Sequence, residues 1–158
     1  MTFPFLSATR GCMEDVSPRC EAILKTLKSN GLKITPQRMA IARVLARSRS
    51  HPSVEEIFEH LKADFPTMSL ATVYRNVLLI TNLGEAQEIG FPDGSNRYDG
   101  HNPYPHPHVV CIVCKTILDP NVSGLQDITE EIAEATGFTI VNHRLDFFGL
   151  CPECRKKQ

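Results

Sequence analysis

The stretch of sequence that decides the fold reads Asp99-Gly-His101-Asn-Pro-Tyr-Pro-His106-Pro-His108-Val-Val-Cys111-Ile-Val-Cys114-Lys-Thr-Ile-Leu-Asp119. It holds three of the six histidines and two of the six cysteines of the 158-residue chain. A pair of thiols therefore lies beside a set of imidazoles and carboxylates, and these two kinds of ligand favour different metal ions. The sequence before this stretch is more basic and shows the pattern of several helices, whereas the sequence after it is more acidic and contains the second pair of cysteines.

The thiols form two knuckles of identical spacing, Cys111-x2-Cys114 and Cys151-x2-Cys154. Two such pairs provide the four thiolates of a tetrahedral Zn²⁺ site that has no open coordination position. The alternative is a pair of disulfides, which persist in oxidising compartments, but nothing in the sequence indicates secretion. We therefore predict a structural zinc. Cys12 and Cys20 are left over, and we expect them to be ordinary surface thiols in the flexible start of the chain.

The imidazoles of His106 and His108 are two residues apart, so on an extended strand both point to the same side. Asp99 precedes them and Asp119 follows them. Nitrogen and carboxylate ligands together suit Fe²⁺, Mn²⁺ or Zn²⁺. A His-x-His pair alone is weak evidence for a metal site, because solvated histidines are common in loops.

Four helix starts precede this stretch, each with a Ser or Thr at the N-cap. They are Ser17-Pro18, Thr35-Pro36, the capping box Ser53-Val-Glu-Glu56 and Ser69. The fourth helix extends to about Leu83, with Val73, Val77 and Ile80 on its inner face. Its predicted outward face carries Thr72, Arg75, Asn76 and Leu79. Arginine and asparagine both make bidentate contacts with base edges, so this face is a candidate for DNA recognition.

Two strands, at residues 86–91 and 96–99, follow the fourth helix and flank a Pro-Asp-Gly-Ser turn. Helices followed by a hairpin predict a winged helix-turn-helix.

Residues 19–85 hold 10 Lys and Arg against 6 Asp and Glu, whereas residues 86–158 hold 6 against 10. A basic half joined to an acidic half is typical of a DNA-binding module joined to another domain. We predict a tail at residues 1–16, a winged-helix domain at 17–99 and a metal-binding dimerisation domain at 100–158.

The second half of the chain predicts a small α+β domain. We expect a strand, a cysteine knuckle and a strand at residues 109–119, and further strands at 138–141 and 145–148. A helix at 125–136 has Leu125, Ile128 and Ile132 on its predicted inner face. The expected dimer surface is the sheet of this domain, which must cover Ile140, Leu145 and Phe147.

Bulk composition is that of a soluble globular protein, with 42% hydrophobic and 22% charged residues. No apolar run approaches the roughly 20 residues that span a bilayer. The apolar patch at residues 3–6 has no basic segment before it, so we do not expect a signal peptide. These features predict a cytoplasmic protein that does not associate with membranes.

Seven motifs in order make the chain resemble the ferric uptake regulator (Fur) family over residues 21–154. They are Thr35-Pro-Gln-Arg38, His51-Pro-Ser-Val-Glu-Glu56, Leu70-Ala-Thr-Val-Tyr-Arg75, Arg97-Tyr-Asp99, His106-x-His108-x2-Cys111-x2-Cys114, Asn142-His143-Arg-Leu and Gly149-x-Cys-x2-Cys154. The resemblance implies a cytoplasmic, dimeric, metal-dependent bacterial repressor. Two recognition helices in a dimer predict a palindromic operator. The candidate DNA-binding residues are Thr72, Arg75 and Asn76, expected to face the major groove, Lys33, Arg38 and Tyr74, expected nearer to phosphates, and Ser69.

The resemblance also supplies a ligand that spacing does not reveal, His51, which lies just before the third helix. The regulatory site it implies, for Fe²⁺ or Mn²⁺, consists of His51, Asp99, His106, His108 and Asp119. Aspartate at positions 99 and 119 resembles the peroxide-sensing (PerR) branch, since iron-sensing members tend to have glutamate there. Arg75 instead resembles the iron-sensing branch, and Lys115 replaces the glycine usual after the second knuckle cysteine.

Three classes of function remain open at this point. The first is a metal-dependent repressor, either peroxide-sensing or purely iron-responsive. The second is a non-haem iron enzyme, because two histidines and a carboxylate also form the site of such oxygenases. The third is a zinc-stabilised interaction module that does not bind DNA.

Prolines at positions 105 and 107, where iron-sensing members often have extra ligands, argue against a third metal site around His143.

Overall fold

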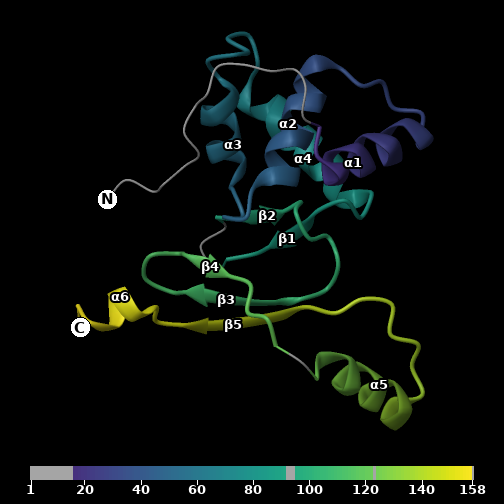
Figure 1. The fold of residues 1–158 in the computed structure, drawn as a ribbon, viewed down its shortest axis with the longest axis vertical. Coiled ribbons are helices and arrows are strands. Elements are labelled where there is room, and N and C mark those ends of the chain that lie inside the picture. Colours follow the sequence, from purple (N-terminus) through teal and green to yellow (C-terminus); the bar gives the residue numbers. More distant parts are fainter. Residues whose placement is uncertain (1–15, 92–94, 123, 158) are drawn as a thin grey trace.

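The computed structural model describes residues 16–91, 95–122 and 124–157. Four helices gather at one end of the molecule (Figure 1). They are α1 (Pro18–Ser29), α2 (Pro36–Arg47), α3 (Val54–Leu61) and α4 (Leu70–Asn82). The predicted tail before Val16, with Cys12, lies outside the described residues, as do residues 92–94 of the predicted turn.

Each predicted helix start is confirmed, with the side chain of the capping residue accepting a hydrogen bond from a backbone N–H. Ser53 and Glu56 form the full capping box, in which each side chain accepts from the other residue's backbone. Such caps satisfy N–H groups that have no partner within the helix. Gly84, with φ of 74°, follows α4 in the left-handed region that favours glycine.

The apolar stripes of the four helices meet in the main core. Its fully buried side chains include Ile23, Leu27, Ile41, Leu45, Ile57, Val73, Val77 and Ile80. Cys20 is also fully buried, so the prediction of a surface thiol is wrong. It lies three residues before Ile23 and seven before Leu27, on the same stripe of α1. Burial raises the pKa of the Cys20 thiol. Leu79, predicted to face outward, is half-buried against this core.

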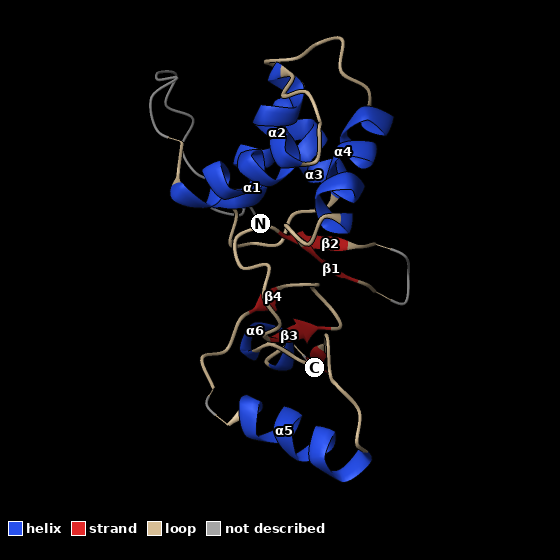
Figure 2. Ribbon diagram, turned by 90° about the vertical axis from the view of Figure 1, so that its right-hand side faces the viewer, coloured by secondary structure: helices blue, strands red, loops and turns tan. Residues whose placement is uncertain are grey.

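Two sheets follow the helices. β1 (Gln87–Ile89) and β2 (Arg97–Asp99) form an antiparallel pair, the wing of the fold, in which Glu88 is opposite Tyr98. The second sheet has the order β4-β3-β5, built from β3 (Pro107–Cys111), β4 (Ile117–Leu118) and β5 (Leu145–Gly149). β3 pairs antiparallel with β4 and parallel with β5. The wing lies between the helices and the three-stranded sheet (Figure 2).

A second buried cluster consists of Ile89, Phe91, Val110 and Ile117. The first two residues belong to β1 and the segment after it, and the others belong to β3 and β4. The wing therefore packs against the three-stranded sheet. This packing places the ends of β2, β3 and β4 close together.

The C-terminal region departs from the predictions in two places. Residues 138–141 form no strand, and Val141 is 92% exposed. Residue types that favour strands make a strand only where a neighbouring strand is available for pairing. On α5 (Leu125–Thr136), Ile128 and Ile132 are exposed rather than inward. This helix lies at the end of the molecule opposite the helical region (Figure 1).

A short helix, α6 (Pro152–Arg155), which the sequence did not predict, follows β5. Within the described ranges, the structure has no helix that is long and apolar enough to cross a membrane.

Candidate metal centres

The first candidate centre is the thiolate cluster of Cys111, Cys114, Cys151 and Cys154. The four sulfur atoms lie within 4.8 Å of one another. Cys111 ends β3, Cys151 caps α6 and Cys154 lies within α6. The turn between the first two thiols closes because Lys115 adopts φ of 62° and its N–H donates to the carbonyl of Cys111 at 2.9 Å. Non-glycine residues adopt this conformation uncommonly.

Hydrogen bonds make the four thiols unequal as acids. The backbone N–H of Cys151 donates to Cys111 Sγ at 3.4 Å, and backbone hydrogen bonds of this kind lower the pKa of Cys111 to about 6. Hydrogen bonding with Thr116 lowers the pKa of Cys114. The hydrogen bond with Cys151 raises the pKa of Cys154 to about 12. Binding of a divalent cation would release the protons that these thiols hold. Four convergent thiolates fit a structural Zn²⁺.

The second candidate centre is the imidazole cluster of His51, Asp99, His106, His108 and Asp119. Ligand atoms of the first four lie within 4.8 Å of one another. His51 Nε2 lies 3.0 Å from Asp119 Oδ1 and 3.6 Å from Asp99 Oδ2. His106 Nε2 lies 3.2 Å from Asp99 Oδ2. All five residues that the resemblance implied therefore lie together.

Contacts between β2 and the start of α3 bring His51 to Asp99. The backbone N–H of Tyr98 donates to the carbonyl of Pro52 at 3.0 Å, and these two residues immediately adjoin the two ligands. Arg97 also forms an ion pair with Glu56 of the α3 capping box. His51 has φ of 51°, a left-handed conformation that costs a non-glycine residue on the order of 1 kcal/mol. The pairing with β2 offsets this cost and holds the ring inward.

The carboxylate of Asp99 is oriented by the loop that follows it. Its Oδ1 accepts from the backbone N–H groups of His101 at 2.8 Å and Asn102 at 3.0 Å. Burial alone raises the pKa of Asp99, but the nearby His51 imidazole and the hydrogen bonds from these N–H groups hold it below its ordinary value. Asp99 is therefore ionised at neutral pH. Its Oδ2 is buried, has no hydrogen-bond partner among the described residues and is close to His51 and His106.

The next residue, Gly100, fixes the position of this loop. Arg19 Nε donates to the Gly100 carbonyl at 2.8 Å, and the same guanidinium forms an ion pair with Glu85. A Cβ at Gly100 would lie 2.7 Å from the Cβ of Leu45 and 3.1 Å from its backbone carbon. Only glycine allows this approach to α2. The main core of the helical region therefore contacts the residue next to a candidate ligand.

The rings of His106 and His108 present Nε2 to the cluster. His106 Nδ1 donates to the Tyr104 carbonyl at 2.7 Å, which directs Nε2 toward the cluster. Burial lowers the pKa of His108, and the charges of His106 and His51 lower it further, so its ring is neutral at neutral pH. Both Nε2 atoms are buried and, within the described part of the chain, have no hydrogen-bond partner, and the same holds for Asp99 Oδ2. Orphaned atoms that converge in this way fit a cation bound by nitrogen and carboxylate, such as Fe²⁺, Mn²⁺ or Zn²⁺.

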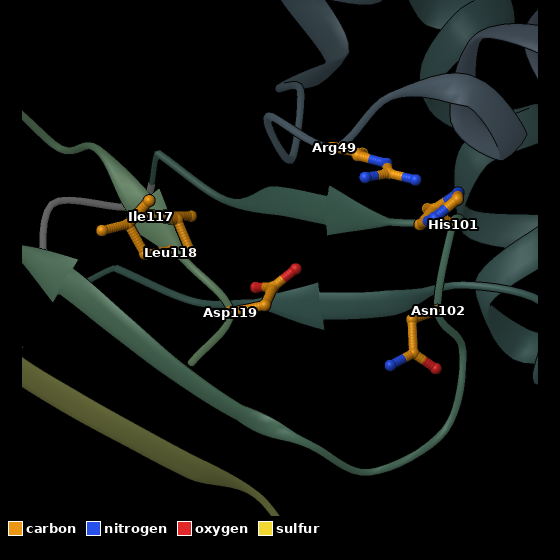
Figure 3. Close-up of a pocket in the computed structure, with 6 residues that line it drawn as sticks. All are labelled: Arg49, His101, Asn102, Ile117, Leu118 and Asp119. Atoms are coloured by element: carbon orange, nitrogen blue, oxygen red, sulfur yellow. The ribbon is translucent and has the colours of Figure 1, made fainter. Parts of the chain in front are cut away.

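Asp119 differs from the other four ligands because it reaches the surface. Its side chain is 37% exposed, whereas that of His106 is 12% exposed and that of His51 is 1% exposed. Asp119 lines an open depression of about 550 Å³ between the two regions (Figure 3). The lining residues are Arg49, His101, Asn102, Ile117, Leu118 and Asp119.

The candidate DNA-binding residues lie along α4 and beside the start of α2. Tyr74 is 50% exposed and Arg75 is exposed, whereas Thr72 and Asn76 are half-buried. Arg38 Nε donates to Asn76 Oδ1 at 2.9 Å, and Asn76 Nδ2 donates to the Thr72 carbonyl at 2.8 Å. The guanidinium of Arg38 also donates to the Lys33 carbonyl, and Ser69 caps α4. Hydrogen bonds thus bring Lys33, Arg38, Ser69, Thr72 and Asn76 together, while Tyr74 and Arg75 are exposed on α4.

Sequence reasoning missed Asp146, whose Oδ1 lies 3.4 Å from His108 Nδ1. The motif Asn142-His143-Arg-Leu ends directly before this aspartate but does not include it. The signal that reveals it is the register of β5 against β3, which pairs His108 with Asp146.

The sequence model of the ferric uptake regulator family matches residues 29–148. The chain belongs to this family. Among the relatives, the "Peroxide operon regulator" of Bacillus subtilis is 40% identical over 135 residues, which cover 85% of this chain and 92% of that protein. This Fur-family chain also resembles solved structures of the family over nearly its full length.

The ferric uptake regulator Fur of Helicobacter pylori, described as having three functional metal-binding sites, matches with a TM-score of 0.74 and 26% identity. The match covers 86% of this chain and 93% of that chain. PerR of Streptococcus pyogenes, described in terms of peroxide sensing and gene regulation, matches with a TM-score of 0.51 and 31% identity. That match covers 91% of this chain and 98% of the other. The winged helix-turn-helix and the small sheet domain with its thiolate cluster are thus a Fur-family fold.

Proposed function

We propose that the protein is a metal-dependent transcriptional repressor that binds DNA and responds to hydrogen peroxide through bound Fe²⁺. Mn²⁺ acts as a co-repressor that does not react with peroxide. The observation that carries this proposal is the imidazole cluster, in which buried ligands from the helical region and from the three-stranded sheet converge. The similarity to a peroxide operon regulator supports it.

The two candidate centres have different tasks in this proposal. Zn²⁺ occupies the thiolate cluster and stabilises the C-terminal region, because four thiolates leave no open position for chemistry. Fe²⁺ or Mn²⁺ occupies the imidazole cluster. There, His51 and Asp99 belong to the winged-helix domain at residues 17–99, and His106, His108 and Asp119 belong to the metal-binding domain at 100–158. The ligands of one cation therefore hold the two domains in a fixed arrangement.

DNA binding is assigned to the exposed side of α4. Arg75 is placed to read a base edge, and Tyr74, Arg38 and Lys33 are placed nearer to phosphates. The protein acts as a homodimer on a palindromic operator in the cytoplasm. Support for the dimer comes from the exposed apolar side chains of the C-terminal region, which include Phe147 at 52% and Phe138 at 72% exposure. Surfaces of this kind are typical of protein interfaces.

The response to peroxide depends on which side chains border the cation. Bound Fe²⁺ supplies the redox chemistry with hydrogen peroxide. All three histidines present their rings to this site, and the resemblance to the peroxide-sensing branch assigns the oxidation to His51 or His106. An oxidised imidazole is a poorer ligand, so the connection between the two domains weakens and the repressor releases DNA. No catalytic turnover is part of this function, since the oxidised protein is the signal.

The alternative is a purely iron-responsive repressor that releases DNA only when the metal is lost. Arg75 favours this alternative, because the resemblance to the iron-sensing branch is carried by that residue. Both aspartates of the imidazole cluster favour peroxide sensing. The two functions share DNA binding, zinc and the dimer, and they differ in what peroxide does to the iron-loaded protein.

Mass spectrometry of peroxide-treated protein separates the two functions. We expect one added oxygen atom on a peptide containing His51 or His106 in the Fe²⁺-loaded protein, together with release of operator DNA in a gel-shift assay. The Mn²⁺-loaded protein serves as the control and should keep both its mass and its DNA. Oxidation confined to cysteines, or equal oxidation with Mn²⁺, would reject peroxide sensing and leave the iron-responsive repressor.

The assigned face of α4 is tested by Arg75→Ala. If Arg75 reads a guanine, the variant loses about 1–3 kcal/mol of affinity for a cognate operator. Its zinc content and melting temperature should stay unchanged, because Arg75 is exposed. Equal affinity of the variant and the parent would show that another face contacts the bases.

A further inference from the structure

Asp146 lies directly behind one of the ligand imidazoles. β5 runs parallel to β3, and the register places Asp146 opposite His108. Asp146 Oδ1 lies 3.4 Å from His108 Nδ1, and the two side chains are 14% and 3% exposed. The other ring nitrogen, Nε2, faces the imidazole cluster, 3.9 Å from Asp119 Oδ1. The ring of His108 therefore lies between a carboxylate and the candidate metal position.

The two oxygens of Asp146 have different surroundings. Oδ2 accepts from Arg144 Nη2 at 2.6 Å, at the side where Arg144 is half-exposed. Oδ1 is buried and has no hydrogen-bond partner of normal geometry among the described residues. The contact with His108 Nδ1 is slightly longer than a normal hydrogen bond, so a small movement of the ring would complete it. Arg144 fixes the carboxylate so that Oδ1 faces the ring.

We propose that Asp146 is a positioning residue that holds His108 with a proton on Nδ1, and thereby presents Nε2 as the ligand of the regulatory cation. The inference rests on the proposed function of the imidazole cluster. A carboxylate that accepts from the far nitrogen of a ligand histidine fixes the tautomer and makes the ring a stronger donor. His51 Nδ1, by contrast, is buried without a partner, and His106 Nδ1 faces a neutral carbonyl. Among the described ligand rings, His108 alone has a carboxylate behind it.

The same pairing joins the two candidate centres. Three residues beyond His108, Cys111 pairs with Gly149 in the same register, and the N–H of Ile112 donates to the Gly149 carbonyl at 2.9 Å. Cys111 is itself one of these paired positions and Cys151 follows the other by two residues, and both belong to the thiolate cluster. A cation held by this cluster would therefore stabilise the register of β3 and β5 that keeps Asp146 opposite His108.

The test uses Mn²⁺ as the probe and the zinc-loaded full chain. Asp146→Asn keeps the shape of the side chain and removes its charge, and Asp146→Ala removes both charge and oxygen. The affinity for Mn²⁺ is measured from the electron paramagnetic resonance signal of the free ion, so DNA binding is not needed. We expect the affinity to fall about tenfold for Asp146→Asn and up to about 100-fold for Asp146→Ala.

Two controls separate this role from a structural one. Asp127→Asn makes the same chemical change on exposed α5 and should leave the Mn²⁺ affinity unchanged. Arg144→Gln removes the ion pair but leaves the carboxylate behind the ring, so it should weaken Mn²⁺ binding less than Asp146→Asn. An equal loss in Arg144→Gln would show that only the ion pair matters and would overturn the proposal.

The tautomer provides a second readout. ¹⁵N spectra of the histidine rings should report a proton on Nδ1 of His108 in the zinc-loaded parent without Mn²⁺, and a mixture of tautomers in Asp146→Asn under the same conditions. Parent-like Mn²⁺ affinity in Asp146→Asn, or an unchanged tautomer, would reject the proposal, and if Asp146→Ala loses zinc, Asp146→Asn decides. A parent that binds Mn²⁺ but no DNA would contradict the proposed repressor function while leaving this inference standing.

Discussion

The thiolate cluster and the imidazole cluster both use β3, but they draw on different parts of the chain. The thiolate cluster takes its ligands from the adjacent C-terminal ends of two parallel strands, β3 and β5, and from the segments that follow them. The imidazole cluster takes His51 and Asp99 from beside the helices and the other ligands from the three-stranded sheet. A cluster within one region can stabilise that region. A cluster that joins two regions can control how they are arranged.

The largest effect should follow from damage to the thiolate cluster. In Cys111→Ser we expect loss of zinc and loss of cooperative melting of the C-terminal region, because the metal supplies its folding free energy. Structural zinc contributes on the order of 10 kcal/mol in small zinc domains. Zinc analysis and thermal melting check this outcome. Cys20→Ala is the matched control, since its buried thiol lies in the helical region, and it should keep its zinc. If Cys111→Ser kept its full zinc content and melted like the parent, the thiolate cluster would not be the one that stabilises the C-terminal region.

A smaller effect on folding, but a large one on regulation, should follow from His51→Ala. Losing a direct ligand should weaken Mn²⁺ binding by more than the roughly 10–100-fold that the loss of an outer partner produces. Zinc should remain bound, because His51 is not part of the thiolate cluster. Gel shifts with and without Mn²⁺, beside zinc analysis, measure both effects. His143→Ala serves as the control and should behave as the parent. If Mn²⁺ still promoted DNA binding in His51→Ala, the imidazole cluster would not be what joins the regions.

The smallest effect should come from Gly100→Ala, which moves a ligand without removing it. The new Cβ would overlap Leu45, and overpacking of this kind costs about 1–3 kcal/mol. The loop carrying Asp99 must shift, so Mn²⁺ affinity should fall together with the stability of the helical region. Gly90→Ala is the matched control, because the nearest atom to its Cβ would be 3.8 Å away. Denaturant unfolding measures the stability of both variants, and Mn²⁺ titration measures their affinity for the cation. Equal stability and equal affinity in Gly100→Ala and Gly90→Ala would contradict the prediction that Gly100 positions Asp99.

Local signals in the sequence predicted most of the helical region. A cap such as Ser53 or Ser69 acts on N–H groups two or three residues away, so its effect can be read without knowing the fold. The same holds for the two cysteine knuckles, whose spacing is itself the site. Cys20 was misread because its place near the start of the chain suggested a surface, although its spacing from Ile23 and Leu27 places it in the core.

Features that depend on tertiary pairing were not predictable in this way. Residues 138–141 are Phe-Thr-Ile-Val, all residue types that favour strands, yet no strand pairs with them in the described structure. His51 reaches the cluster through the contact of Pro52 with Tyr98, which no periodicity shows, and only the resemblance to a family pointed to it. Neither periodicity nor the resemblance to a family pointed to Asp146, because its contact with His108 depends on the register of β5 against β3.

The exposure of Asp119 has a consequence for the speed of metal exchange. Four of the five ligands of the imidazole cluster are nearly inaccessible, and Asp119 alone borders the open depression (Figure 3). An incoming ion would meet Asp119 first, and a departing ion would leave it last. We therefore expect Asp119 to affect the residence time of the bound cation more strongly than it affects the equilibrium affinity of the site for that cation. The repressor would then exchange its cation as the metal concentration in the cell changes, without exposing the four buried ligands.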